Sequence, residues 1–194
     1  MALVITKSAS IISWDSSPQV QPTTGEGGPG FLKSVNDFVT APLLGTIGDM
    51  YRFVRIPTNA KIKRVGLVIT AVATAGAADI DVAFSDNPND GTPPSLATLT
   101  NPVVQITGPV DNKLFGTAKA LTAAILVDTD QTFAAASTIF TLAMTNLPLW
   151  QALVNLGATQ FTTDPGGFFD IIMKATTVPT VTTPIIGIKV DYVE

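Results

Sequence analysis

The chain has 194 residues, of which 13% are charged, and it contains neither histidine nor cysteine. Without these two residue types, serine–histidine and cysteine–histidine nucleophiles are excluded, as are the usual ligand sets for zinc, haem and iron–sulfur clusters. The formal net charge of −4 argues against binding to nucleic acid.

The shortage of charge also bears on how the surface is used. Ordinary soluble domains carry about 25% charged residues, roughly twice the share in this chain. The length and a hydrophobic share of 46% suit one domain with a sizeable core that needs no disulfides. The simplest explanation is that partners, or copies of the chain, cover much of its surface.

No stretch of the sequence predicts export or a membrane span. The first residues, MALVITKSAS, lack the basic segment that precedes the apolar part of a signal peptide. Residues 65–78 are uncharged but shorter than the roughly 20 apolar residues of a membrane helix. The uncharged residues 131–163 are interrupted by polar residues and by Pro148. We therefore expect no membrane partner.

Residues 1–40 are predicted to form an extended N-terminal arm. Residues 3–5 and 11–12 could form short strands, and residues 16–30 contain four glycines and three prolines, which favour irregular chain. Two interpretations remain open: a disordered leader, or an arm that becomes ordered against a neighbouring subunit. In the second, the apolar anchors are Trp14, Phe31 and Leu32.

Residues 41–194 are predicted to form a β-rich body. Residues 50–56 form a strand that ends at Pro57, and the next strand follows a turn and covers residues 60–72. In that second strand the apolar face falls on odd positions, whereas Ile62 has the opposite parity, which indicates a bulge near Lys63 and Arg64.

Two later strands show clean alternation. In residues 78–85 the apolar side chains of Ile80, Val82 and Phe84 should point inward, while Asp79 and Asp81 should lie on a solvated face. The last strand has Ile186, Ile188, Val190 and Tyr192 on one side. Further short strands are expected at residues 103–106, 124–127, 138–144 and 169–175.

One helix is expected at about residues 147–156. Asn146 can cap it, Pro148 suits its first turn, and Gly157 suits the position after its end. Many short strands and a single helix place the chain in the all-β class. The expected architecture is a β-sandwich or jelly-roll-like domain with one short helix and the extended arm.

Five of the eleven basic residues lie within thirteen positions: Arg52, Arg55, Lys61, Lys63 and Arg64. One interpretation is that they occupy the solvated outer faces of two adjacent strands. The other is that they form a strip that docks onto an acidic protein surface, in which case binding should weaken with salt. Together with Trp14, Phe31 and Leu32, they are the candidate interface residues.

The sequence offers no convincing catalytic, cofactor or metal site. Asp79 and Asp81 share a strand face, but no third group lies at a telling spacing. The loop that starts at Asp86 begins like a calcium loop, yet Pro88 and Ala97 stand where two ligands are required. The glycine-rich residues 25–28 follow no predicted strand, so they do not form a phosphate loop. We therefore expect no enzyme activity and no cofactor.

Several short motifs occur in a fixed order. They are residues 48–60 (GDMYRFVRIPTNA), 76–80 (GAADI), 111–115 (DNKLF), 148–157 (PLWQALVNLG) and 164–167 (DPGG). This arrangement is similar to small virion proteins of tailed bacteriophages, of the kind found beside the major capsid protein. The resemblance covers about residues 45–194. It departs from the family pattern where Val154, Asn155 and Leu156 precede Gly157.

The resemblance implies a capsid decoration or cement protein that stabilises the phage head. It implies a place on the capsid surface of the virion after assembly in the host cytoplasm. Its partners would be the major capsid protein and copies of itself, as a trimer or a similar symmetric cluster. Alternatives are a tail, collar or head-fibre base component, or a carbohydrate-binding module, which would need an exposed aromatic platform.

Overall fold

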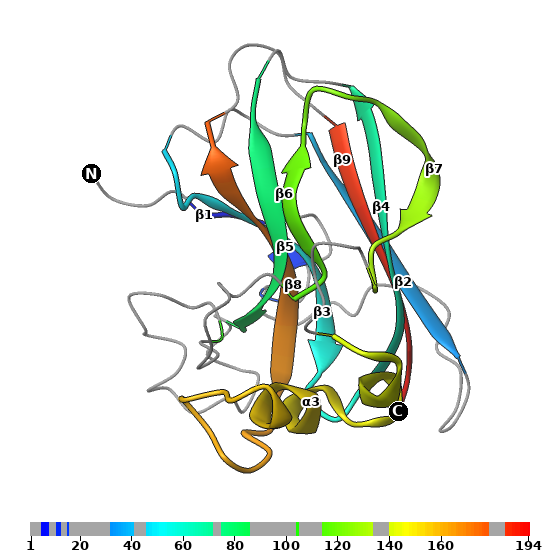
Figure 1. The fold of residues 1–194 in the computed structure, drawn as a ribbon, viewed down its shortest axis with the longest axis vertical. Helices are drawn as coiled ribbons and strands as arrows, with labels where there is room; N and C mark the ends of the chain where they lie inside the picture. The colour runs from blue at the N-terminus through cyan, green and yellow to red at the C-terminus, as the bar shows by residue number, and fades with distance from the viewer. Residues whose placement is uncertain are drawn as a thin grey trace.

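The computed structural model describes residues 5–7, 11–12, 15, 32–40, 46–71, 75–85, 104, 114–133, 140–178 and 185–194. Two β-sheets pack face to face, as Figure 1 shows, which confirms the predicted sandwich. Sheet A has the strand order β1 (Ile5–Lys7), β3 (Met50–Pro57), β8 (Phe168–Thr177), β5 (Ala77–Phe84) and β6 (Gly116–Ala120). Sheet B has the order β2 (Lys33–Thr40), β9 (Ile185–Val193), β4 (Lys61–Ala71) and β7 (Ile125–Asp130).

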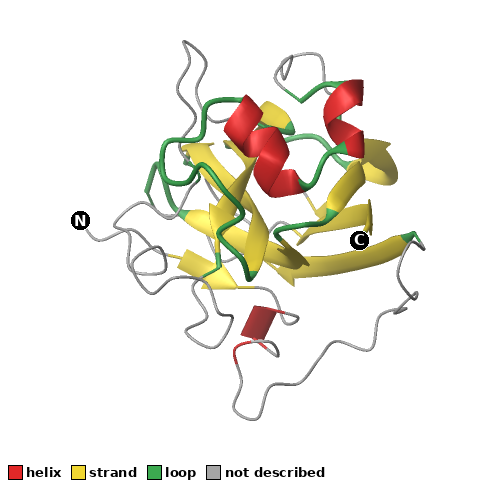
Figure 2. Ribbon diagram, turned by 90° about the horizontal axis from the view of Figure 1, so that it is seen from below, coloured by secondary structure: helices red, strands yellow, loops and turns green. Residues whose placement is uncertain are grey.

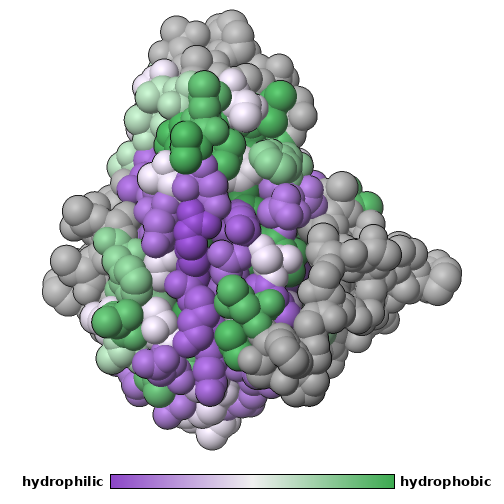
Figure 3. Space-filling view, turned by 90° about the vertical axis from the view of Figure 1, so that its right-hand side faces the viewer, coloured by the Kyte–Doolittle hydropathy of each residue, from purple (hydrophilic) through white to green (hydrophobic). Residues whose placement is uncertain are grey.

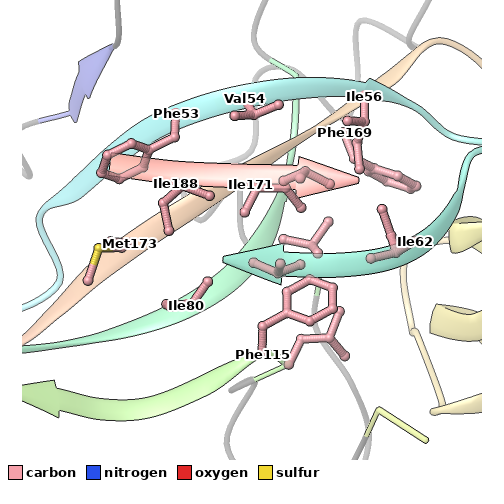
Figure 4. Packing of buried hydrophobic residues seen from close by; sticks show 14 of the residues in the cluster. Phe53, Val54, Ile56, Ile62, Ile80, Phe115, Phe169, Ile171, Met173 and Ile188 are labelled. Carbon is pink, nitrogen blue, oxygen red and sulfur yellow. The ribbon is translucent and has the colours of Figure 1, made fainter. Parts of the chain in front are cut away.

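The core lies between the two sheets and follows the predicted alternation. In β9, Ile186, Ile188 and Val190 are at most 1% exposed. Figure 4 shows side chains from both sheets meeting in this layer, including Phe53, Phe169 and Ile188. Each fully buried side chain of this size stabilises the fold by about 1.5–3 kcal/mol. The apolar faces predicted for β5 and β9 are therefore confirmed.

The predicted bulge in β4 is also confirmed. The pairing of β4 with β9 shifts register between Ile62 and Arg64. The extra residue changes the parity of the strand, so that Ile62 and Val65 both point into the core and are fully buried.

Helical segments close one end of the sandwich, as Figure 2 shows. The helix α3 (Leu149–Asn155) confirms the predicted helix, with Pro148 in place of Asn146 at its N-cap. The 3-10 helix η1 (Leu142–Asn146) precedes α3. The strand predicted at residues 138–144 is therefore wrong for residues 140–144, the part of that range that the structure describes. A short apolar run cannot be distinguished as strand or helix by periodicity alone. The candidate at 103–106 falls outside the described residues except for Val104.

Three of the sequence motifs meet at this end of the molecule. In the turn between β3 and β4, the carbonyl oxygen of Ala60 accepts the backbone N–H of Leu149 over 2.8 Å. The hydroxyl of Thr58 donates to Asp164 Oδ1 over 2.7 Å. Glycine is required after Asp164 because Gly166 and Gly167 have φ values of 71° and 73°. These motif residues therefore build the fold at one corner.

The described parts of residues 1–40 contribute an edge strand to each sheet. β1 pairs in parallel with β3 at the edge of sheet A. Ile11 and Ile12 are helical, where the sequence suggested a strand. β2 pairs with β9 in an unbroken antiparallel register from Lys33 to Thr40. The boundary between arm and body at residue 40 stays a prediction.

Candidate interaction surfaces

A buried ionic cluster lies on the outer face of sheet A. Arg52 and Arg55 project from β3 toward Asp170 on the neighbouring strand β8. The Nη1 of Arg52 lies 2.5 Å from Asp170 Oδ2, and the Nε of Arg55 lies 2.7 Å from Asp170 Oδ1. Arg52 Nη1 also donates to the carbonyl of Phe84 over 2.8 Å. The two arginines are 1% and 4% exposed, so neither offers its charge to a partner.

The N-terminal segment extends this cluster. Asp15 accepts from Arg55 Nη1 over 2.5 Å and from Lys7 Nζ over 2.6 Å. Ile11, which lies between Lys7 and Asp15 in the sequence, is fully buried. Residues of the N-terminal segment, some forty positions before Arg52 and Arg55 in the sequence, therefore cover part of the outer face of sheet A. Of the predicted apolar anchors, Trp14 and Phe31 lie outside the described residues, whereas Leu32 is 62% exposed.

The other three predicted basic residues belong to sheet B. The Nζ of Lys63 donates to the carbonyl of Thr145 over 2.7 Å. Arg64 Nη1 pairs with Asp128 Oδ2 at 2.5 Å, and this hydrogen bond raises the pKa of Arg64. Lys61 is half-buried.

The five basic residues therefore do not form one strip, because β3 and β4 are consecutive in the chain but lie in different sheets. A docking role stays a prediction for Lys61, Lys63 and Arg64.

The outer face of sheet B carries a polar strip whose charges pair among themselves. Lys189 Nζ lies 3.5 Å from Asp191 Oδ1, and Arg64 Nη1 lies 3.8 Å from Asp191 Oδ2. Arg64 and Asp128 add the pair described above. Figure 3 shows the strip in purple, running along the face between green apolar side chains. Internal pairing leaves this strip little net charge with which to attract an acidic surface.

Exposed apolar side chains mark two margins of sheet B. On the β7 side, Leu126 and Val127 are 71% and 77% exposed. On the opposite side, Phe38 of β2 and Ile185 of β9 are also exposed. The sequence interpretation did not single out these residues. The run of three apolar residues from Ile125 in a short strand was a signal that could have found the first pair, because an alternating edge strand buries only one face.

The predicted solvated face of β5 is wrong. Asp79 and Asp81 are 6% and 2% exposed. The Oδ1 of Asp79 accepts the backbone N–H of Ala118 over 2.6 Å, at a residue with a φ of 45°. Burial raises the pKa of Asp81 well above its usual value, although a hydrogen bond from the Val82 N–H and the charge of Lys174 oppose the rise. The face is buried because it belongs to the same covered side of sheet A as Asp170.

Replacing Asp81 with asparagine is expected to change how stability depends on pH. A carboxyl with a raised pKa binds its proton more tightly in the folded state, so the contribution of Asp81 to stability falls as pH rises above about 4. The asparagine side chain cannot ionise, so the melting temperature of Asp81→Asn minus that of the native chain should become more positive between pH 4 and pH 8. A domain of this size shifts by about 2–4 °C per kcal/mol.

The matched control is Asp130→Asn, at an exposed carboxylate whose Oδ1 accepts the N–H of Thr132. The same measurement on Asp130→Asn shows how large a pH trend the loss of an exposed carboxylate produces. A trend for Asp81→Asn that does not exceed the trend for Asp130→Asn would contradict the raised pKa of Asp81.

The described residues hold no group of three or more acidic side chains that could bind a metal ion. Tyr51 and Tyr192 are 1% and 7% exposed and Trp150 is half-buried, so these rings form no open platform for a sugar. None of the helices in the described part of the chain has the length and apolar character needed to cross a bilayer.

No protein-family model matches this chain, and no curated protein matches it. Among solved structures, a chain from the capsid of Ralstonia phage GP4 is similar over 98% of both chains, with 12% sequence identity and a TM-score of 0.43. A likeness at that level assigns neither a family nor a function. The functional interpretation therefore depends on the residues and surfaces of the chain itself.

Proposed function

We propose that this chain is a structural protein of a tailed-bacteriophage virion that decorates the capsid and stabilises the shell. The observation that carries the proposal is the ordered set of motifs between Gly48 and Gly167, which resembles small proteins found beside the major capsid protein. Three of these motifs meet at one corner of the fold, through Thr58, Ala60 and Asp164. Such contacts are expected of motifs whose role is to specify the fold of a structural protein.

The surface supports the same proposal. Only 13% of the residues are charged, and several large apolar side chains are exposed, among them Leu32, Leu126 and Val127. Exposed apolar side chains that gather together mark surfaces that a partner covers. The proposed partners are the major capsid protein and copies of the chain.

The proposed mechanism is multivalent binding on a lattice. Many copies, each with modest affinity, would together brace neighbouring capsid subunits. The arm is proposed to contribute contacts between subunits through residues such as Leu32, and Lys61 and Lys63 would add an electrostatic contribution that salt weakens.

Purified particles of the phage that encodes the chain test this proposal. We expect hundreds of copies per particle on a quantified gel, and electron microscopy should locate them on the outside of the head. The variants Leu32→Ser and Lys61→Glu should bind particles more weakly than the native chain while melting at nearly the same temperature.

A dozen copies or fewer would favour the second candidate, a tail, collar or head-fibre base component. Absence of the chain from the particles would reject a virion role altogether.

A further inference from the structure

We infer that copies of this chain associate through the two opposite margins of sheet B. The β7 margin consists of Leu126, Val127 and Asp130. The β2 margin consists of Asn36, Phe38 and Ile185. The β7 margin of one copy is inferred to pack against the β2 margin of the next, a contact that does not depend on the virion role proposed above.

The β7 margin owes its shape to a bulge. The pairing of β4 with β7 passes from Leu67–Thr129 directly to Ile69–Ile125. Three residues of β7, from Leu126 to Asp128, therefore lie opposite Val68 alone. The extra length pushes Leu126 and Val127 away from the sheet, where they are 71% and 77% exposed. A bulged strand is a poor template for main-chain pairing, so the contact must be made by side chains.

The β2 margin owes its shape to a glycine. A Cβ atom at Gly187 would collide with the ring of Phe38, the residue that faces Gly187 across the β2–β9 pair. The missing side chain lets the ring lie over the β9 backbone, with 49% of Phe38 still exposed. Ile185, further along the same strand, is 36% exposed. The result is a fixed apolar surface beside the polar strip.

The two margins carry matching chemistry at matching heights along the strands. One row of the sheet runs from Phe38 through Gly187 to Val68 and ends at the bulge with Leu126 and Val127. A second row runs from Asn36 through Lys189 and Gly66 to Asp130.

Copies placed side by side with their strands aligned would set apolar side chains against Phe38. The same placement would set the Asp130 carboxylate against the Asn36 amide, an acceptor against a donor.

Charge favours a second copy over other occupants. The polar strip between the margins is neutralised by its own ion pairs, so it offers little attraction to a strongly charged partner. Two β7 margins facing each other would gather Asp128 and Asp130 of both copies, which repel. A contact between different margins avoids this repulsion. Such a heterologous contact builds a ring when its rotation closes.

Complementation between two variants tests the inference. Val127→Asp destroys the β7 margin and keeps the β2 margin, whereas Phe38→Asp does the reverse. Light scattering coupled to size exclusion should show an oligomer for the native chain and a monomer for each variant alone. An equimolar mixture should give a heterodimer with twice the monomer mass and nothing larger, because only one pair of intact margins remains.

Ile12→Ser is the matched control, since Ile12 is 58% exposed and belongs to neither margin. It should keep the native mass. Ile185→Asp serves as a second β2-margin variant if Phe38→Asp melts at a much lower temperature.

A native chain that stays monomeric, a variant that keeps the native mass, or a mixture that stays monomeric would each overturn the inference. Loss of particle binding with an unchanged oligomer would bear on the proposed function alone.

Discussion

Replacing Asp170 with alanine is expected to lower the free energy of unfolding by about 3–5 kcal/mol, because it leaves two arginines buried without their shared carboxylate. Arg52 and Arg55 both bond to Asp170, and the carboxylate is fully buried. The arginines cannot reach water without opening the outer face of sheet A. Urea denaturation followed by fluorescence or circular dichroism measures the loss.

Asp128→Ala provides the control for this result. Asp128 also pairs with an arginine at 2.5 Å, but its side chain is 32% exposed. Exposed pairs of this kind contribute about 0–1 kcal/mol. Equal losses for the two variants would show that water reaches Asp170 as readily as Asp128, and that the cluster does not hold sheet A together.

The buried cluster was not predicted from the sequence, whereas features that depend on a few neighbouring residues were. Alternation identified the inward residues of β5 and β9 because a strand repeats every two residues whatever lies around it. The helix after Pro148 and the bulge beside Ile62 were predictable for the same reason, since each depends on local geometry. All of these features are decided within a few residues.

The fate of the outward residues depends on distant segments. Asp79 and Arg55 look like solvent-facing positions when each strand is considered alone. Arg55 is buried against Asp170, 115 positions beyond it, and against Asp15 of the N-terminal segment, whereas the carboxylate of Asp79 accepts the N–H of Ala118 from another strand. No local pattern indicates which segment will cover a sheet.

The interaction surface was only partly predictable, because the sequence of a turn does not indicate whether the two strands that it joins lie in the same sheet. Residues 57–60 read as a simple turn between adjacent strands, which placed Arg55 and Lys61 on one surface. The turn instead passes from sheet A to sheet B. The charges of the basic stretch are thereby separated, and the exposed apolar margins become the stronger candidates for contact.

The pair Ile11→Ala and Ile12→Ala distinguishes two states of the N-terminal segment. Ile11 is fully buried and Ile12 is 58% exposed. Truncating a buried isoleucine costs about 2–5 kcal/mol, whereas an exposed neighbour is expected to change stability by less than about 0.5 kcal/mol. Thermal melting of the isolated chain measures both. The predicted difference arises only if the segment packs on its own body in solution.

Equal and small effects would mean that Ile11 and Asp15 leave the outer face of sheet A in the isolated chain. Arg55 would then lack Asp15, and the face around Met50, Ala83 and Ile172 would become available to another chain. A large effect of Ile11→Ala would restrict the proposed contacts between subunits to the rest of the predicted arm and to the margins of sheet B. Leu32, exposed at the start of β2, lies where those two regions meet.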